Sequence, residues 1–154
     1  MSLPIRPIVL PSRRLLAETC HTGRPHEVVE ALSDAAQAWA RRQAWGTAEA
    51  HLEEALRWAV FVGGVDALVE LHCQAAEMAA CSAEQGEPVE RAAARRRARA
   101  HAVAAGRLAD RVACPAWETV VLLRASDVLD RCGHRNDATE LQARAVRQMI
   151  GSDR

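Results

Sequence analysis

The chain has 154 residues, a length that suits one domain able to bury a core without disulfides or metal ions. Hydrophobic residues make up 49% of it, which excludes an intrinsically disordered protein, and 20 acidic residues balance 20 basic ones. Thirty-two residues are alanine, one is phenylalanine and none is tyrosine. Because alanine favours helices and strands need β-branched and aromatic residues, the composition predicts an all-α fold.

Three prolines interrupt the short apolar run at the N-terminus. Pro4, Pro7 and Pro11 block a helix, so residues 1–11 are predicted to be extended, and Ser12 can cap a short helix that completes an arm over residues 1–24. The interrupted run does not fit a signal peptide. No stretch approaches the roughly 18 apolar residues of a membrane-spanning helix. We therefore expect a cytoplasmic protein without a membrane partner.

Two features of composition concern the protein's origin and its thiols. All 20 basic residues are arginine and only one residue is asparagine, which indicates a bacterial genome of high GC content. The five cysteines are scattered and contain no C-x-x-C motif. Free, buried thiols are therefore expected rather than a disulfide framework.

Apolar periodicity predicts six longer helices, over residues 26–44, 47–62, 66–86, 88–112, 115–133 and 136–150. Pro25, Pro88 and Pro115 suit first helical turns, and Gly133 suits the position after a helix. Short connections make neighbouring helices antiparallel. We predict one domain of three stacked helical hairpins over residues 25–150, with a frayed tail at 151–154. A closed bundle of the same helices is the alternative.

The apolar spacing defines the inward faces of these helices residue by residue. In the 115–133 helix, the residues predicted to face inward are Val121, Leu122, Ala125, Val128, Leu129 and Cys132. In the 66–86 helix, Leu68, Leu71, Ala75, Met78 and Ala79 are predicted to face inward, and Asp66, Glu70, Cys73, Glu77 and Glu84 outward. The inward stripe of the 88–112 helix is predicted to be Ala94, Ala98, His101, Ala105, Leu108 and Val112. In the last helix it is Ala138, Leu141, Ala145, Val146 and Met149.

The last hairpin resembles the tetratricopeptide-repeat family. The resemblance depends on Leu122, Ser126, Leu129, Gly133, Ala138, Ala145 and Val146, and more loosely on Leu32, Ala36, Trp39, Ala48, Leu52, Ala55 and Leu56 in the first hairpin. In the middle hairpin only Ala75, Met78, Ala79, Ser82 and Gly86 fit. The 88–112 helix departs from the family because it is long and contains His101. The hairpins also repeat about every 45 residues, whereas the family's repeat is roughly 34 residues long.

The resemblance implies a right-handed superhelix that binds protein or peptide ligands on a concave surface formed by the first helix of each hairpin. The residues that would map to this surface are Gln37, Arg41, Glu84, Asp127, Asp130 and Arg131.

Charge is distributed unevenly along the chain. Residues 47–90 contain nine acids and one arginine, whereas residues 91–111 contain seven arginines and one acid. Arg91, Arg95 and Arg99 are four residues apart and share one helix face. These arginines can dock an acidic partner or bind an anion, or they can solvate the helix and pair with Glu77 and Glu84. Nucleic acid is not expected, because the chain is neutral and no aromatic residues interleave with the arginines.

No motif for catalysis or metal binding stands in the sequence. It has no HExxH, paired-cysteine, G-x-S-x-G or P-loop pattern, so we expect no enzymatic activity and no cofactor.

His72 and His101 can serve as ligand-binding or pH-sensing residues, or as hydrogen-bonded core residues. Trp45, beside a turn, can serve as a hot spot for a partner or can pack against the next helix.

The sequence therefore predicts a non-enzymatic protein- or peptide-binding adaptor. Two alternatives remain open. One is a homodimeric structural module, and the other is a sensor of a small ligand or anion built around His101 and the arginines of residues 91–111.

Overall fold

A computed structural model describes residues 24–62 and 64–151, and every regular element in these two stretches is helical. The elements are α2 (Pro25–Ala40), α3 (Trp45–Val62), α4 (Val65–Gln85), α5 (Pro88–Leu108), the 3-10 turn η1 (Ala109–Arg111), α6 (Pro115–Arg131) and α7 (Arg135–Gly151). The prediction of six longer helices is confirmed. The predicted N-terminal arm, its short helix and residues 152–154 lie outside the described residues.

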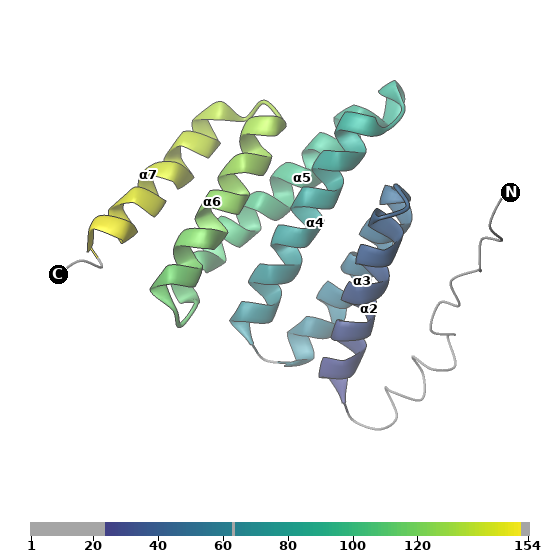
Figure 1. Cartoon of the computed structure of the whole chain (residues 1–154), viewed down its shortest axis with the longest axis horizontal. Helices are drawn as coiled ribbons and strands as arrows, with labels where there is room; N and C mark the ends of the chain where they lie inside the picture. Colours follow the sequence, from purple (N-terminus) through teal and green to yellow (C-terminus); the bar gives the residue numbers. More distant parts are fainter. Residues whose placement is uncertain (1–23, 63, 152–154) are drawn as a thin grey trace, which may run out of the picture.

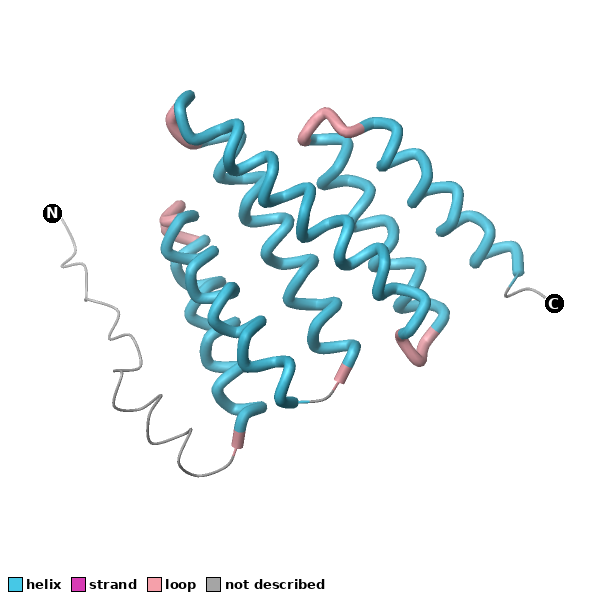
Figure 2. Tube along the Cα trace, turned by 180° about the vertical axis from the view of Figure 1, so that it is seen from behind, coloured by secondary structure: helices cyan, strands magenta, loops and turns pink. Residues whose placement is uncertain are grey.

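Successive helices pair into three antiparallel hairpins, α2–α3, α4–α5 and α6–α7, which lie in a row in chain order (Figure 1). The view from behind shows the same row (Figure 2). Between hairpins, α3 packs on α4 and α5 packs on α6, while α4 and α6 also touch directly. This arrangement places α4 and α5 at the centre of the molecule.

Local sequence sets most of the helix ends. Pro25, Pro88 and Pro115 occupy first turns, as predicted. After α6, Gly133 adopts a φ of 85°, and the amide of His134 donates to the carbonyl of Leu129 at 2.8 Å. This six-residue closure is the Schellman motif, which favours glycine at the left-handed position.

The helix predicted over residues 88–112 is shorter than expected. α5 ends at Leu108, one 3-10 turn follows, and Val112 is already extended. Cys114, which precedes Pro115, is extended too. Because a residue before proline is disfavoured in a helix, the chain leaves the helical conformation before Pro115 opens α6.

α4 separates two hydrophobic cores. Its Leu71, Ala75 and Met78 pack with α2 and α3, whereas its Val69, Cys73, Ala76, Ala79 and Ala80 pack with α5, α6 and α7. The prediction that Cys73 faces outward is therefore wrong, since its side chain is 1% exposed. A helix with neighbours on both sides has no single apolar stripe, so a one-face interpretation of its sequence fails.

Two other predicted faces also need correction. The fully buried stripe of α5 is Ala94, Ala98, Ala102 and Ala105, and Ala109 of η1 continues it, which leaves His101 at the edge of the seam. In α7, Val146 and Met149 are 46% and 47% exposed rather than inward. α7 is the last described helix of the row and packs mainly on α6, so only one side of it is covered.

Candidate functional site

A ladder of ion pairs joins α4 to α6. Arg124 donates to Glu77 at 2.7 Å and to Glu70 at 2.8 Å, and one heptad later Arg131 donates to Glu84 at 2.8 Å. The seven-residue spacing on both helices places these side chains on facing stripes. A hydrogen bond from Arg131 holds the pKa of Glu84 below its ordinary value. Most of the charge on this face is therefore neutralised within the protein.

This ladder corrects one interpretation of the charge pattern. Glu77 and Glu84 were predicted to pair with the arginines of residues 91–111, but α6 supplies their partners. The paired arginines of α5 have partners on other helices. Arg97 pairs with Glu49 of α3 at 2.6 Å, and Arg99 pairs with Asp137 of α7 at 2.9 Å.

The ladder includes three of the residues expected on a concave surface. Glu84 and Arg131 bind each other, and Asp127 lies 3.5 Å from Arg131. Asp130 is 3.9 Å from Arg135. The remaining two, Gln37 and Arg41, are exposed at the end of α2, and no side-chain hydrogen bond or ion pair joins them to the ladder within residues 24–62 and 64–151.

Several arginines of α5 and η1 are left without a carboxylate partner among the described residues. Among the described residues, no ion pair involves Arg95, Arg96, Arg107 or Arg111, and all four are exposed. Arg91 donates only to the carbonyl of Gly86, at 3.1 Å. The predicted common face of Arg91, Arg95 and Arg99 thus contains one arginine in an ion pair and two outside one.

A polar groove runs between α5 and α7. It consists of two adjoining hollows, of about 310 and about 280 Å³, which share Arg99 and Asp137. Its charged and titratable lining residues are Arg99, Arg107, His134, Arg135, Asp137, Glu140 and Arg144. We call this the α5–α7 groove. Four arginines against two acids make it basic.

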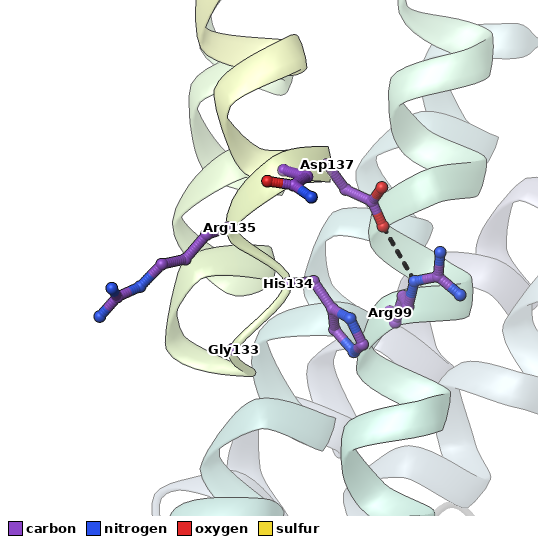
Figure 3. A pocket seen from close by; sticks show the side chains of 6 residues that line it. Arg99, Gly133, His134, Arg135 and Asp137 are labelled. Atoms are coloured by element: carbon purple, nitrogen blue, oxygen red, sulfur yellow. Dashed lines mark hydrogen bonds and ion pairs between the residues drawn. The ribbon is translucent and has the colours of Figure 1, made fainter.

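Figure 3 shows the side chains that line the first of these two hollows. Asp137 turns from the first turn of α7 toward Arg99, with the ring of His134 beside that ion pair, while Arg135 points away. Arg144 donates to the carbonyl of Gly106 at 2.9 Å. A Cβ on Gly106 would lie 3.0 Å from Leu141, so the missing side chain lets α7 approach α5 here.

Of the groove's residues, Arg99 and Arg107 belong to the arginine run over residues 91–111. His134, Arg135, Asp137, Glu140 and Arg144 were not predicted from the sequence to be site residues. Arg99, Val103 and Arg107 are four residues apart and lie on one face of α5. The sequence did not indicate that α7 lies opposite this face of α5. The groove is formed by two helices that belong to different hairpins.

Two histidines meet between α4 and α5. Nδ1 of His72 lies 3.1 Å from Nδ1 of His101, and Nε2 of His101 lies 3.0 Å from a carboxylate oxygen of Glu53 on α3. Burial, followed by the charge of His101, lowers the pKa of His72. The interpretation of both histidines as hydrogen-bonded residues of the helix seam agrees with these contacts.

Cys73 and Cys132 are buried, as expected for the thiols, but Cys81 is half-buried and Cys114 is exposed, so the expectation of buried thiols is wrong for Cys114. Burial raises the pKa of Cys73 to about 12 and also raises that of Cys132, so both thiols are protonated near neutral pH. Trp45 donates from Nε1 to Gln85 at 3.2 Å, which supports packing of the first turn against α4. Within the described part of the chain, no group of three His, Cys, Asp or Glu residues is placed to hold a metal ion.

No protein-family model matches the chain, and neither the curated proteins nor the solved structures contain a significant match to it. None of the described helices is both long enough and apolar enough to span a membrane.

Proposed function

We propose that this protein is a non-enzymatic adaptor that binds an acidic segment of a partner protein in the α5–α7 groove. The observation that carries the proposal is the surplus of arginine in and beside this groove. Arg107 lines it without an ion pair among the described residues, and Arg95 lies one turn before Arg99 on the same face of α5. An extended segment with carboxylates every few residues complements such a row of guanidinium groups.

The other face supports the proposal by contrast. On α4 and α6 the carboxylates and guanidinium groups already satisfy each other, so a charged ligand would have to displace internal partners. On α5, exposed guanidinium groups are available without breaking any contact. In our proposal the hairpins are arranged as in tetratricopeptide-repeat proteins, with the ligand on the side of the second helices rather than the first.

The test uses the full chain and a fluorescein-labelled acidic peptide of alternating Glu and Gly, measured by fluorescence anisotropy. We expect saturable binding that weakens as salt rises, and no binding of the matching Gln–Gly peptide. The double variant Arg95→Glu with Arg107→Glu should weaken binding at least roughly tenfold, because each reversal changes an attraction of about 1 kcal/mol into a repulsion. Neither substitution removes an ion pair, so folding is expected to persist.

The matched control is Arg41→Glu, a charge reversal at an exposed arginine of α2. It should leave the affinity unchanged. An equal loss of affinity in Arg41→Glu would place the ligand on the concave face implied by the family resemblance. Tight binding of inorganic phosphate alone at the groove would favour the anion sensor, and absence of saturable peptide binding would refute the adaptor.

Self-assembly is a second candidate, favoured by exposed apolar residues at the C-terminal end of the row. Val146, Met149 and Ile150 are 46%, 47% and 64% exposed, and Met149 borders a hollow of about 510 Å³ next to Pro115. Sedimentation velocity of the protein and of Ile150→Asp tests this candidate. A dimer that dissociates in the variant would support it, and a monomer at all concentrations would rule it out.

A further inference from the structure

Three hydrogen-bonding groups from three helices form a chain across the centre of the molecule. Glu53 comes from α3, His101 from α5 and His72 from α4, and consecutive members are 3.0 and 3.1 Å apart. The side chain of His101 is 14% exposed and that of Glu53 is 48% exposed. The series of hydrogen bonds therefore begins at the surface of the first hairpin and ends between the two helices of the second.

The two close nitrogens restrict how many protons the pair can hold. With both rings neutral, His101 donates from Nε2 to Glu53, and its bare Nδ1 accepts a hydrogen bond from Nδ1 of His72. With one extra proton, His101 is an imidazolium that donates to both neighbours, and Nδ1 of His72 becomes the acceptor. With two extra protons, both Nδ1 atoms carry hydrogen, and no hydrogen bond can form between them.

We propose that Glu53, His101 and His72 form an acid-sensitive junction, which joins the first hairpin to the second at neutral pH and opens when both imidazoles are protonated. Two cations at this separation repel each other, and both donors would face one another without an acceptor. Separation of the rings loosens α4 from α5 and, through Glu53, α3 from both. The junction does not depend on a ligand in the α5–α7 groove.

The charged groups around the pair leave Glu53 as its principal counter-ion. On the α3 side, Glu49 is engaged by Arg97, which also interacts electrostatically with Glu53. From α6, Arg124 is held by Glu70 and Glu77 on another face of α4. From α7, Asp137 is paired with Arg99. One carboxylate is enough to balance one imidazolium but not two.

The direction of the pH effect follows from the environment of His72. Its pKa in the folded protein lies below the ordinary value of 6.5, so the unfolded chain takes up this proton first as pH falls. Stability is complete above pH 6.5 and is lost as pH falls toward the folded-state pKa. Over that interval one proton changes the unfolding constant by up to about tenfold per pH unit.

The direct test is nitrogen NMR of the whole chain labelled with 15N-histidine, recorded with a chelator present. At pH 7.5 we expect a scalar coupling between the Nδ1 atoms of His72 and His101, transmitted through the shared proton, and its disappearance at acidic pH. Independent titration of the two rings at ordinary pKa values, without coupling, would overturn the proposal. A spectrum that changes only when Zn²⁺ is added would assign the pair to a metal instead.

The second test compares stability at pH 7.5 and 5.5 by urea denaturation. His72→Gln removes the second imidazole and should reduce the loss of stability on acidification, whereas His26→Gln, at an exposed position of α2, should show the wild-type loss. If His72→Gln does not fold, Glu53→Gln provides the alternative, because Glu53 is the exposed member of the three hydrogen-bonded residues. It should enlarge the acid effect by removing the counter-ion, and an unchanged pH profile in Glu53→Gln would contradict the junction.

Discussion

Removal of Arg124 should measure how much the α4–α6 ladder contributes to stability. This guanidinium binds both Glu70 and Glu77, and the three side chains are 26%, 35% and 37% exposed. A partly exposed ion pair contributes up to about 1 kcal/mol, so the two together should contribute about 1 to 2 kcal/mol. Arg124→Met keeps the apolar stem of the side chain and removes only the charge and the hydrogen bonds.

The expected change in melting temperature follows from the size of the fold. An unfolding entropy of about 2.1 cal/mol/K per residue over the roughly 130 described residues gives about 0.27 kcal/mol/K. A loss of 1 to 2 kcal/mol therefore lowers Tm by about 4 to 7 °C, measurable by circular dichroism. In about 1 M NaCl the difference should shrink, because salt screens partly exposed pairs.

A matched control and a double-mutant cycle separate pairing from general damage. Arg57→Met removes an exposed pair with Glu54 on the same helix and should change stability by less than about 0.5 kcal/mol. In the cycle, Arg124→Met and Glu77→Gln should be less destabilising together than the sum of their separate effects. Additive effects, or a Tm of Arg124→Met within about 1 °C of wild type, would refute a stabilising ladder.

Four further measurements examine one turn, the core and the thiols. Gly133→Ala should cost about 1 kcal/mol in urea denaturation, because φ at this position is 85° and an L-residue is strained there. Leu122→Ala, at a side chain with no exposed surface, should cost about 2 to 5 kcal/mol, and a smaller cost would mean that the core collapses around the cavity. Cys114 should react with a thiol reagent in the native protein, but Cys73 only after unfolding. Since burial raises the pKa of Cys73 from its ordinary value to about 12, stability should fall as pH rises through that interval.

The number, order and approximate ends of the helices could be predicted because each has a local cause. Proline in the first turn, glycine after the last turn and an apolar period near 3.6 are properties of short segments. The same causes explain the largest error in helix length. Residues 108–115 follow the alanine-rich α5 and end at Pro115, which cannot continue a helix from the preceding residues. The position of the break therefore depends on where α6 must begin.

The prediction of which helix face is buried succeeded or failed according to how many other helices pack against that helix. In α6, the predicted inward residues Val121, Leu122 and Leu129 are fully buried. α4 has partners on both sides, which buries Cys73, and α7 has fewer, which exposes Val146. A periodic pattern reports which residues are apolar, whereas burial also depends on which helices lie nearby, and that information is not local.

The same distinction explains why the charge pattern was hard to interpret from the sequence. An acidic stretch followed by a basic one suggests that adjacent helices pair with each other, because antiparallel neighbours are the closest elements in the chain. In the fold, however, the acids of α4 face α6, two helices later, and the arginines of α5 face α3 and α7. Alanines at the α4–α5 seam bring these two helices close together, which leaves no room for long charged side chains between them. Opposite charges on adjacent helices thus pair outward, and the arginines that find no carboxylate there are the ones available to a partner.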